Sequence, residues 1–219
     1  MKLTEFTATL GLVLGCAAVA HSAELRVTVK DHKGKSIEDV VVLAVPADPR
    51  GAQHSKAPQD AVDQVDKQFV PFVKPVFVGS TVRFPNSDNI RHQVYSFSPA
   101  KKFELPLYGG TNAAPVIFDK PGVVVLGCNI HDWMIGYIYV AETPFFAKTG
   151  PLGTASITDL PPGEYSVRIW HPNMDRAEET TSRQVAVTAE PVTSAEWQIG
   201  LKTSIRVPRV SGAASPSYP

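Results

Sequence analysis

Eight consecutive residues in the second half of the chain, 127–134 (Gly-Cys-Asn-Ile-His-Asp-Trp-Met), constrain this protein most. They place a thiol at Cys128, an imidazole at His131 and a thioether at Met134, all within seven positions. Soft sulfur ligands bind transition metals, whereas magnesium and calcium prefer oxygen. Because a short loop can fold three such side chains around one ion, the segment predicts a transition-metal site.

A site of this kind needs a second imidazole, and His92 is the natural candidate. It lies in the segment 86–95, between two strand-like runs, so the metal would be bound across the fold by a distant strand and a loop. Two histidines and a cysteine near one plane, with methionine as a long axial ligand, form the ligand set of a blue copper centre, whereas structural zinc sites are closed and tetrahedral. We therefore predict one copper ion in a redox site.

The segment 61–141 resembles the plastocyanin- and amicyanin-like cupredoxins. The likeness rests on the compact Cys-x-x-His-x-x-Met loop and on the runs 68–71 and 78–84, which lead toward the upstream histidine. It implies an all-β fold, a Greek-key cupredoxin barrel or sandwich, in which an asparagine, best matched by Asn86, braces the ligand loop. It also implies a type 1 copper site with four ligands: His92, Cys128, His131 and Met134.

Cysteine usage agrees with metal binding. The chain has two cysteines, and if Cys16 is removed with a leader, Cys128 has no disulfide partner. A lone thiol in an oxidising compartment is buried and inert, reactive, or bound to a metal. The neighbouring His131 and Met134 favour the metal-bound state.

Residues 1–23 have the features of a secretory signal peptide: one early lysine, an apolar run over 10–20 and small residues ending at Ala23. We therefore expect a periplasmic protein. The alternative is a lipobox at 13–16, which would make Cys16 a lipidated first residue. No later apolar run approaches the roughly 20 residues that span a bilayer, so no transmembrane segment is expected.

The whole chain has 219 residues, which suits two β domains of ordinary size. Alternation over 25–30 predicts a strand, 31–35 a turn, and 40–45 a returning, more deeply buried strand. Farther on, 153–172 predicts two strands paired across a Pro-Pro-Gly turn.

These outer segments resemble the carboxypeptidase-regulatory-like and transthyretin-type β-sandwiches. The simplest arrangement is therefore a cupredoxin inserted into a small split sandwich, because insertions are tolerated where loop ends lie close together. The alternative is that 25–45 extends the cupredoxin sheet. The expected division is a signal peptide (1–23), a split sandwich (24–57 and 144–201), a cupredoxin domain (60–142) and a disordered tail (202–219).

Other candidate residues have simpler explanations. His32 and His54 lie in polar stretches and are expected to be solvated, and His171 follows a strand of the other domain without nearby ligands, so we expect it to be structural. Near the metal loop, an apolar surface for redox partners is expected from four residues: Ile130, Trp133, Phe97 and Pro99.

The predicted function is one-electron transfer between two redox proteins, a donor and an acceptor. The net charge of zero gives no reason to expect nucleic acid as a partner. An enzyme is excluded, because copper oxidases and nitrite reductases need a second copper centre and the chain has no His-x-His pair. Two alternatives remain: a copper carrier or sequestration protein, and a binding module in which the metal only staples the fold.

Overall fold

The computed structural model describes residues 23–48, 59–111, 113–188 and 190–203. Over these residues the protein is built from strands with one short 3-10 helix, Glu178–Thr181, and it contains no α-helix. The all-β Greek-key class predicted from the sequence is confirmed. No described helix is long and apolar enough to cross a membrane. The expected leader with Cys16, the loop with His54, and most of the expected tail lie outside the described residues.

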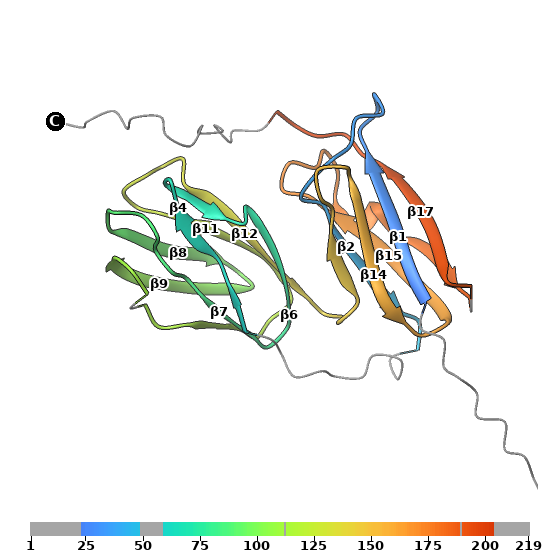
Figure 1. Cartoon of the computed structure of the whole chain (residues 1–219), viewed down its shortest axis with the longest axis horizontal. Helices are drawn as coiled ribbons and strands as arrows, with labels where there is room; N and C mark the ends of the chain where they lie inside the picture. Colours follow the sequence, from blue (N-terminus) through green and yellow to red (C-terminus); the bar gives the residue numbers. More distant parts are fainter. Residues whose placement is uncertain (1–22, 49–58, 112, 189, 204–219) are drawn as a thin grey trace, which may run out of the picture.

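One group of strands combines the two ends of the described chain (Figure 1). In its first sheet, β1 (Ala23–Lys30) lies between β14 (Thr154–Leu160), which is antiparallel to it, and β17 (Val192–Gln198), which is parallel. The second sheet has the order β13, β2, β15, β16 (Phe146–Lys148, Val41–Pro46, Gly163–Trp170 and Arg183–Val187). Among the described strands, β1 and β2 thus hydrogen-bond only to strands that follow residue 145.

Two turns expected to join paired strands instead connect opposite sheets. The turn after β1 does form, since the Asp31 carboxylate accepts the N–H groups of Lys33 and Lys35, but β1 and β2 belong to different sheets. The Pro-Pro-Gly turn likewise leads from β14 in one sheet to β15 in the other. Alternation shows which side chains face inward, and in a sandwich the inward faces of both sheets look alike in sequence.

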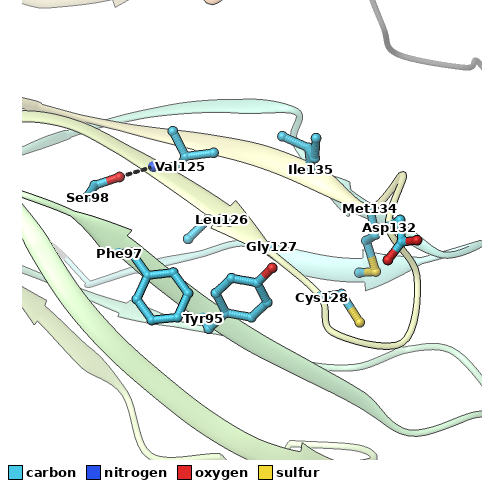
Figure 2. Close-up of a pocket in the computed structure, with 10 residues that line it drawn as sticks. All are labelled: Tyr95, Phe97, Ser98, Val125, Leu126, Gly127, Cys128, Asp132, Met134 and Ile135. Carbon is cyan, nitrogen blue, oxygen red and sulfur yellow. Dashed lines mark hydrogen bonds between the residues drawn. The ribbon is translucent and has the colours of Figure 1, made fainter.

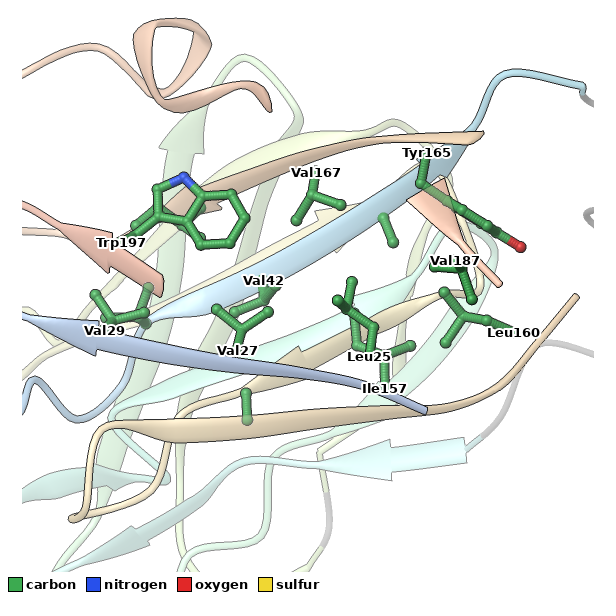
Figure 3. Packing of buried hydrophobic residues seen from close by; sticks show 14 of the residues in the cluster. Leu25, Val27, Val29, Val42, Ile157, Leu160, Tyr165, Val167, Val187 and Trp197 are labelled. Atoms are coloured by element: carbon green, nitrogen blue, oxygen red, sulfur yellow. The ribbon is translucent and has the colours of Figure 1, made fainter. Parts of the chain in front are cut away.

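The core between these two sheets follows the predicted alternation. Leu25, Val27 and Val29 of β1 are fully buried, and Figure 3 shows them facing Val42 and Val167 of the opposite sheet. Their burial supplies the apolar contact that holds the two sheets together.

The other group of strands carries the predicted metal ligands. A five-stranded sheet has the order β6, β12, β11, β8, β9, a three-stranded sheet has the order β10, β7, β3, and β4 pairs with β5. Two of the four neighbouring pairs in the five-stranded sheet and both pairs in the three-stranded sheet join strands that are not consecutive in sequence, as a Greek-key path requires. The bounds are Gln59–Ala61 (β3), Asp63–Val65 (β4), Gln68–Val70 (β5), Val73–Phe77 (β6), Ser80–Arg83 (β7), His92–Ser98 (β8), Lys101–Tyr108 (β9), Val116–Phe118 (β10), Gly122–Gly127 (β11) and Ile135–Ala141 (β12).

A third apolar cluster joins the two groups of strands. Val41 and Leu43 project from the outer face of β2 and pack with Val73 of β6 and Tyr139 of β12. Residues of β2 are therefore buried on both faces, which explains its nearly continuous apolar sequence. Beside this cluster, Arg168 pairs with two carboxylates, Glu142 at 2.8 Å and Glu178 at 2.6 Å.

Candidate metal centre

Pairing of two strands brings the predicted ligands together. β8 begins at His92, β11 ends at Gly127, and the two strands are antiparallel with Gly127 opposite Tyr95. The first residues of β8 therefore lie beside the loop that follows β11, although 36 positions separate His92 from Cys128.

Gly127 allows the close approach of these strands. A Cβ atom at this position would lie only 2.7 Å from the ring of Tyr95. The ring therefore lies against the backbone next to Cys128, and any side chain at 127 would displace it.

Three of the four predicted ligands converge. The Cys128 Sγ lies 3.8 Å from the His92 Nδ1 and 3.8 Å from the His131 Nδ1, and the three donor atoms all lie within 4.8 Å of one another. A bound ion about 2.1 Å from nitrogen and about 2.3 Å from sulfur, with trigonal angles of about 120°, would separate those two atoms by about 3.8 Å. The donor set and its spacing therefore fit a trigonal copper ion.

Met134 lies next to this cluster. Its backbone N–H donates to the His131 carbonyl at 2.9 Å, which folds the loop back toward β12. The side chain is buried and lines, together with Cys128, a groove of about 440 Å³ (Figure 2). The thioether of Met134 and the thiol of Cys128 therefore line the same groove.

The electrostatics of the cluster favour a thiolate. Burial opposes ionisation of Cys128, but its contact with His92 and the hydrogen bonds from the backbone N–H groups of Gln93 and Ile130 outweigh this penalty and lower the pKa of the thiol. Burial likewise disfavours a charged His92, and its hydrogen bonds to Cys128 and Asp88 outweigh that penalty and raise the pKa of the imidazole. Metals bind the deprotonated thiol, so the lowered pKa of Cys128 favours binding of a metal ion in place of the thiol proton.

Asp88 is a site residue that the sequence analysis missed. Its Oδ2 lies 2.6 Å from the His92 Nε2, on the opposite side of the ring from Cys128. Asp88 sits in an irregular loop, where residue spacing does not show the direction of a side chain. Only its position four residues before His92 could have pointed to it.

Asn86 has a different role from the one expected. Its Nδ2 donates to the carbonyls of Ile90 and Tyr108, both at 2.9 Å, and its Oδ1 accepts the N–H of Asp88 at 3.0 Å. These bonds hold the loop that precedes His92, and none of them reaches the segment 127–134. The expectation that Asn86 braces the ligand loop was therefore wrong.

The remaining predicted residues are spread over the molecule. His32 is exposed in the turn after β1. His171 is buried in the other group of strands and accepts the N–H of Asn173, away from the cluster. Around the metal loop, Ile130 is 50% and Phe97 75% exposed, while the half-buried Trp133 packs against the His131 ring with centroids 5.2 Å apart.

No family model matches this sequence, and no curated protein matches it. Among solved structures, a copper-containing nitrite reductase from Thermus scotoductus is similar at 30% identity and a TM-score of 0.37, over 44% of this chain and 25% of its own. A purple cupredoxin from Nitrosopumilus maritimus is similar at 22% identity and a TM-score of 0.34, over 38% of this chain and 99% of its own. An amicyanin mutant in its oxidised form is similar at 18% identity and a TM-score of 0.35, over 46% of this chain and 98% of its own.

Proposed function

We propose that this chain is a periplasmic type 1 (blue) copper protein that carries single electrons between two redox proteins. The observation that carries the proposal is the convergence of one thiol and two imidazole Nδ1 atoms at a spacing of 3.8 Å, with a buried thioether alongside. The proposed ligands are His92, Cys128, His131 and Met134.

The role of the protein residues is to hold one geometry in both oxidation states. When bound, copper supplies a centre that alternates between Cu(II) and Cu(I). Cys128 would offer a thiolate, His92 and His131 would offer nitrogen, and Met134 would offer a thioether sulfur, a donor set that tunes the potential of such centres. His92 is fully buried and bonded on its far side, so little rearrangement accompanies electron transfer.

His131 is the proposed point of electron exchange. It is half-buried, and exposed Ile130 lies beside it in the loop. An apolar rim around a partly accessible ligand allows a partner to approach closely without removing water from charged groups.

We also propose the domain division expected from the sequence. It is supported by the strand pairing, in which β1 and β2 join β13 to β17, and by two separate apolar cores, one in each group of strands. The periplasmic location rests on the leader-like residues 1–23.

Copper loading and the Cys128→Ser variant test the function. The wild-type protein is expected to take up one Cu(II), become intensely blue and undergo reversible one-electron reduction. Cys128→Ser replaces the sulfur with oxygen, so the strong visible absorption should disappear while the far-ultraviolet circular dichroism of the β fold remains. A variant that keeps the absorption would contradict the ligand set. A colourless wild-type protein that prefers zinc would support the alternative of a binding module in which the metal only stabilises the fold.

A copper carrier is the second candidate function. The groove that reaches Cys128 and Met134 favours it, because an exchangeable site needs a path for the ion. Transfer of Cu(I) to a competing chelator distinguishes the two functions. An electron-transfer protein should release copper over hours, whereas a copper carrier should release it within seconds to minutes.

A further inference from the structure

Asp88 makes hydrogen bonds in two directions and connects a metal ligand to a distant turn. Its Oδ2 lies 2.6 Å from the His92 Nε2 and accepts the N–H of Lys67 at 2.9 Å, while its Oδ1 accepts the N–H of Asp66 at 2.6 Å. Asp66 and Lys67 form the turn between β4 and β5, with positive φ angles of 52° and 58°. The carboxylate is thus fixed by groups on both sides.

The geometry decides which nitrogen of His92 is available to a metal. An ionised carboxylate only accepts hydrogen bonds, so the contact at 2.6 Å places a proton on the Nε2 of His92. In a neutral imidazole the other nitrogen then carries a free lone pair. That nitrogen is Nδ1, which faces the Cys128 Sγ at 3.8 Å.

We propose that Asp88 is a positioning residue of the copper site, which fixes the His92 tautomer and orientation and stabilises the oxidised centre relative to the reduced one. Carboxylates bonded to metal-binding imidazoles raise their basicity and orient them. The added negative charge favours Cu(II) over Cu(I), and it acts across a fully buried ring, where screening is weak. This inference rests on the proposed function for its redox part only, because the tautomer exists without metal.

The redox part is tested with Asp88→Asn, which keeps the shape of the side chain and removes its charge. Losing that charge should weaken Cu(II) binding relative to Cu(I) about tenfold, which corresponds to a potential higher by about 59 mV for one electron. Asp88→Ala also removes the acceptor and should lower Cu(II) affinity by about 10- to 100-fold. Measurements are the midpoint potential, the visible spectrum and competition with a copper chelator.

Asp63→Asn is the matched control. Asp63 is the first residue of β4 and accepts hydrogen bonds from the Ser87 hydroxyl at 2.8 Å and the Ser87 N–H at 3.3 Å. Neither of these hydrogen bonds reaches His92. The control removes one equal charge nearby and should leave the potential close to that of the wild type. Equal potentials in wild type, Asp88→Asn and Asp63→Asn would overturn the redox part of the proposal.

The tautomer part is tested in the metal-free protein by nitrogen-15 NMR of labelled histidine. At a pH above the raised pKa of His92, where the ring is neutral, His92 of the wild type should carry its proton on Nε2, and in Asp88→Ala the proton should redistribute toward Nδ1. An unchanged tautomer in a variant with wild-type circular dichroism would overturn the proposal, even if copper binding itself failed. A wild-type protein that binds no copper but shows the expected tautomer would refute the proposed function, while the role of Asp88 in fixing the His92 ring would stand.

Discussion

Single residues control how closely the ligand loop can approach the sheet. The ring of Tyr95 occupies the space where a side chain at 127 would be, so the backbone just before Cys128 lies against an aromatic face. The position of the Cys128 thiol therefore depends on glycine at position 127, where a side chain would meet the Tyr95 ring.

Substituting Gly127→Ala is expected to destabilise the protein by about 1–3 kcal/mol, since the new methyl group overlaps the Tyr95 ring and close-packed regions resist overpacking. In copper-loaded protein it should also shift the visible band, because the displaced backbone carries Cys128. Thermal unfolding and absorption spectra are the measurements. Gly150→Ala, where no atom lies within 4 Å of the new Cβ, is the control, and equal losses in both variants would refute the packing argument.

At the residue scale, the sequence showed which side chains can bind a metal, but it did not show in which direction each side chain points. Cys128, His131 and Met134 are near one another in any fold, because six peptide bonds limit their separation. Asp88 could not be recognised in the same way, since its partners at 66, 67 and 92 come from a turn and a strand whose contact depends on the fold.

Strand ends show how secondary structure places buried polar groups. β15 ends at Trp170, and the next residue, His171, closes a turn by accepting the Asn173 N–H on its Nδ1 at 3.1 Å. Burial lowers the pKa of His171 to about 4, although the charge of Asp39 acts in the opposite direction. The imidazole therefore stays neutral in the folded protein.

This neutral histidine should make stability fall in mild acid. Below its unfolded pKa of about 6.5 the unfolded chain binds a proton that the folded chain does not, so folding is penalised by up to about 1.4 kcal/mol per pH unit as pH falls toward 4. In His171→Asn the side-chain oxygen can still accept the Asn173 N–H, and the slope should be shallower. Urea unfolding of the metal-free proteins at pH 7 and pH 5 measures it, and parallel losses in both would contradict this assignment.

Periodicity predicted strands well and their partners less well. The buried positions of β1 are those of the alternating pattern, and β14 and β15 lie within the range 153–172 that was predicted to hold two strands. Which strand lies beside which was partly wrong, as the two turns that connect opposite sheets show. A side chain that faces inward satisfies the same pattern in either sheet of a sandwich.

At the scale of the whole molecule, an apolar junction connects the two groups of strands. Trp170 of β15 contacts the rings of Tyr137 and Tyr139 on β12, with centroid distances of 5.8 and 5.4 Å. The hydroxyl of Tyr139 also donates to Glu178 at 2.5 Å. Since β12 directly follows the ligand loop, the junction fixes the metal-binding sheet against the other unit.

Trp170→Ala should weaken this junction by about 2 kcal/mol or more, because it removes aromatic contacts and leaves a void. Calorimetry is expected to show one cooperative transition in the wild type and two separated transitions in the variant. Leu152→Ala is the control, since Leu152 is 78% exposed and should change stability by less than about 0.5 kcal/mol. A single transition at an unchanged temperature in Trp170→Ala would refute coupling through this contact.

The sequence alone determined the all-β class and the kind of chemistry, because alternation and ligand type are local properties of the chain. The tertiary structure alone decided that the Nδ1 of His92 faces Cys128 while Asp88 holds its Nε2, and that β2 is buried between a core and a junction. The contact of His92 with Cys128 and the burial of β2 depend on pairing and packing between residues tens of positions apart. No local pattern encodes such pairing, because many strand partners satisfy the same alternation.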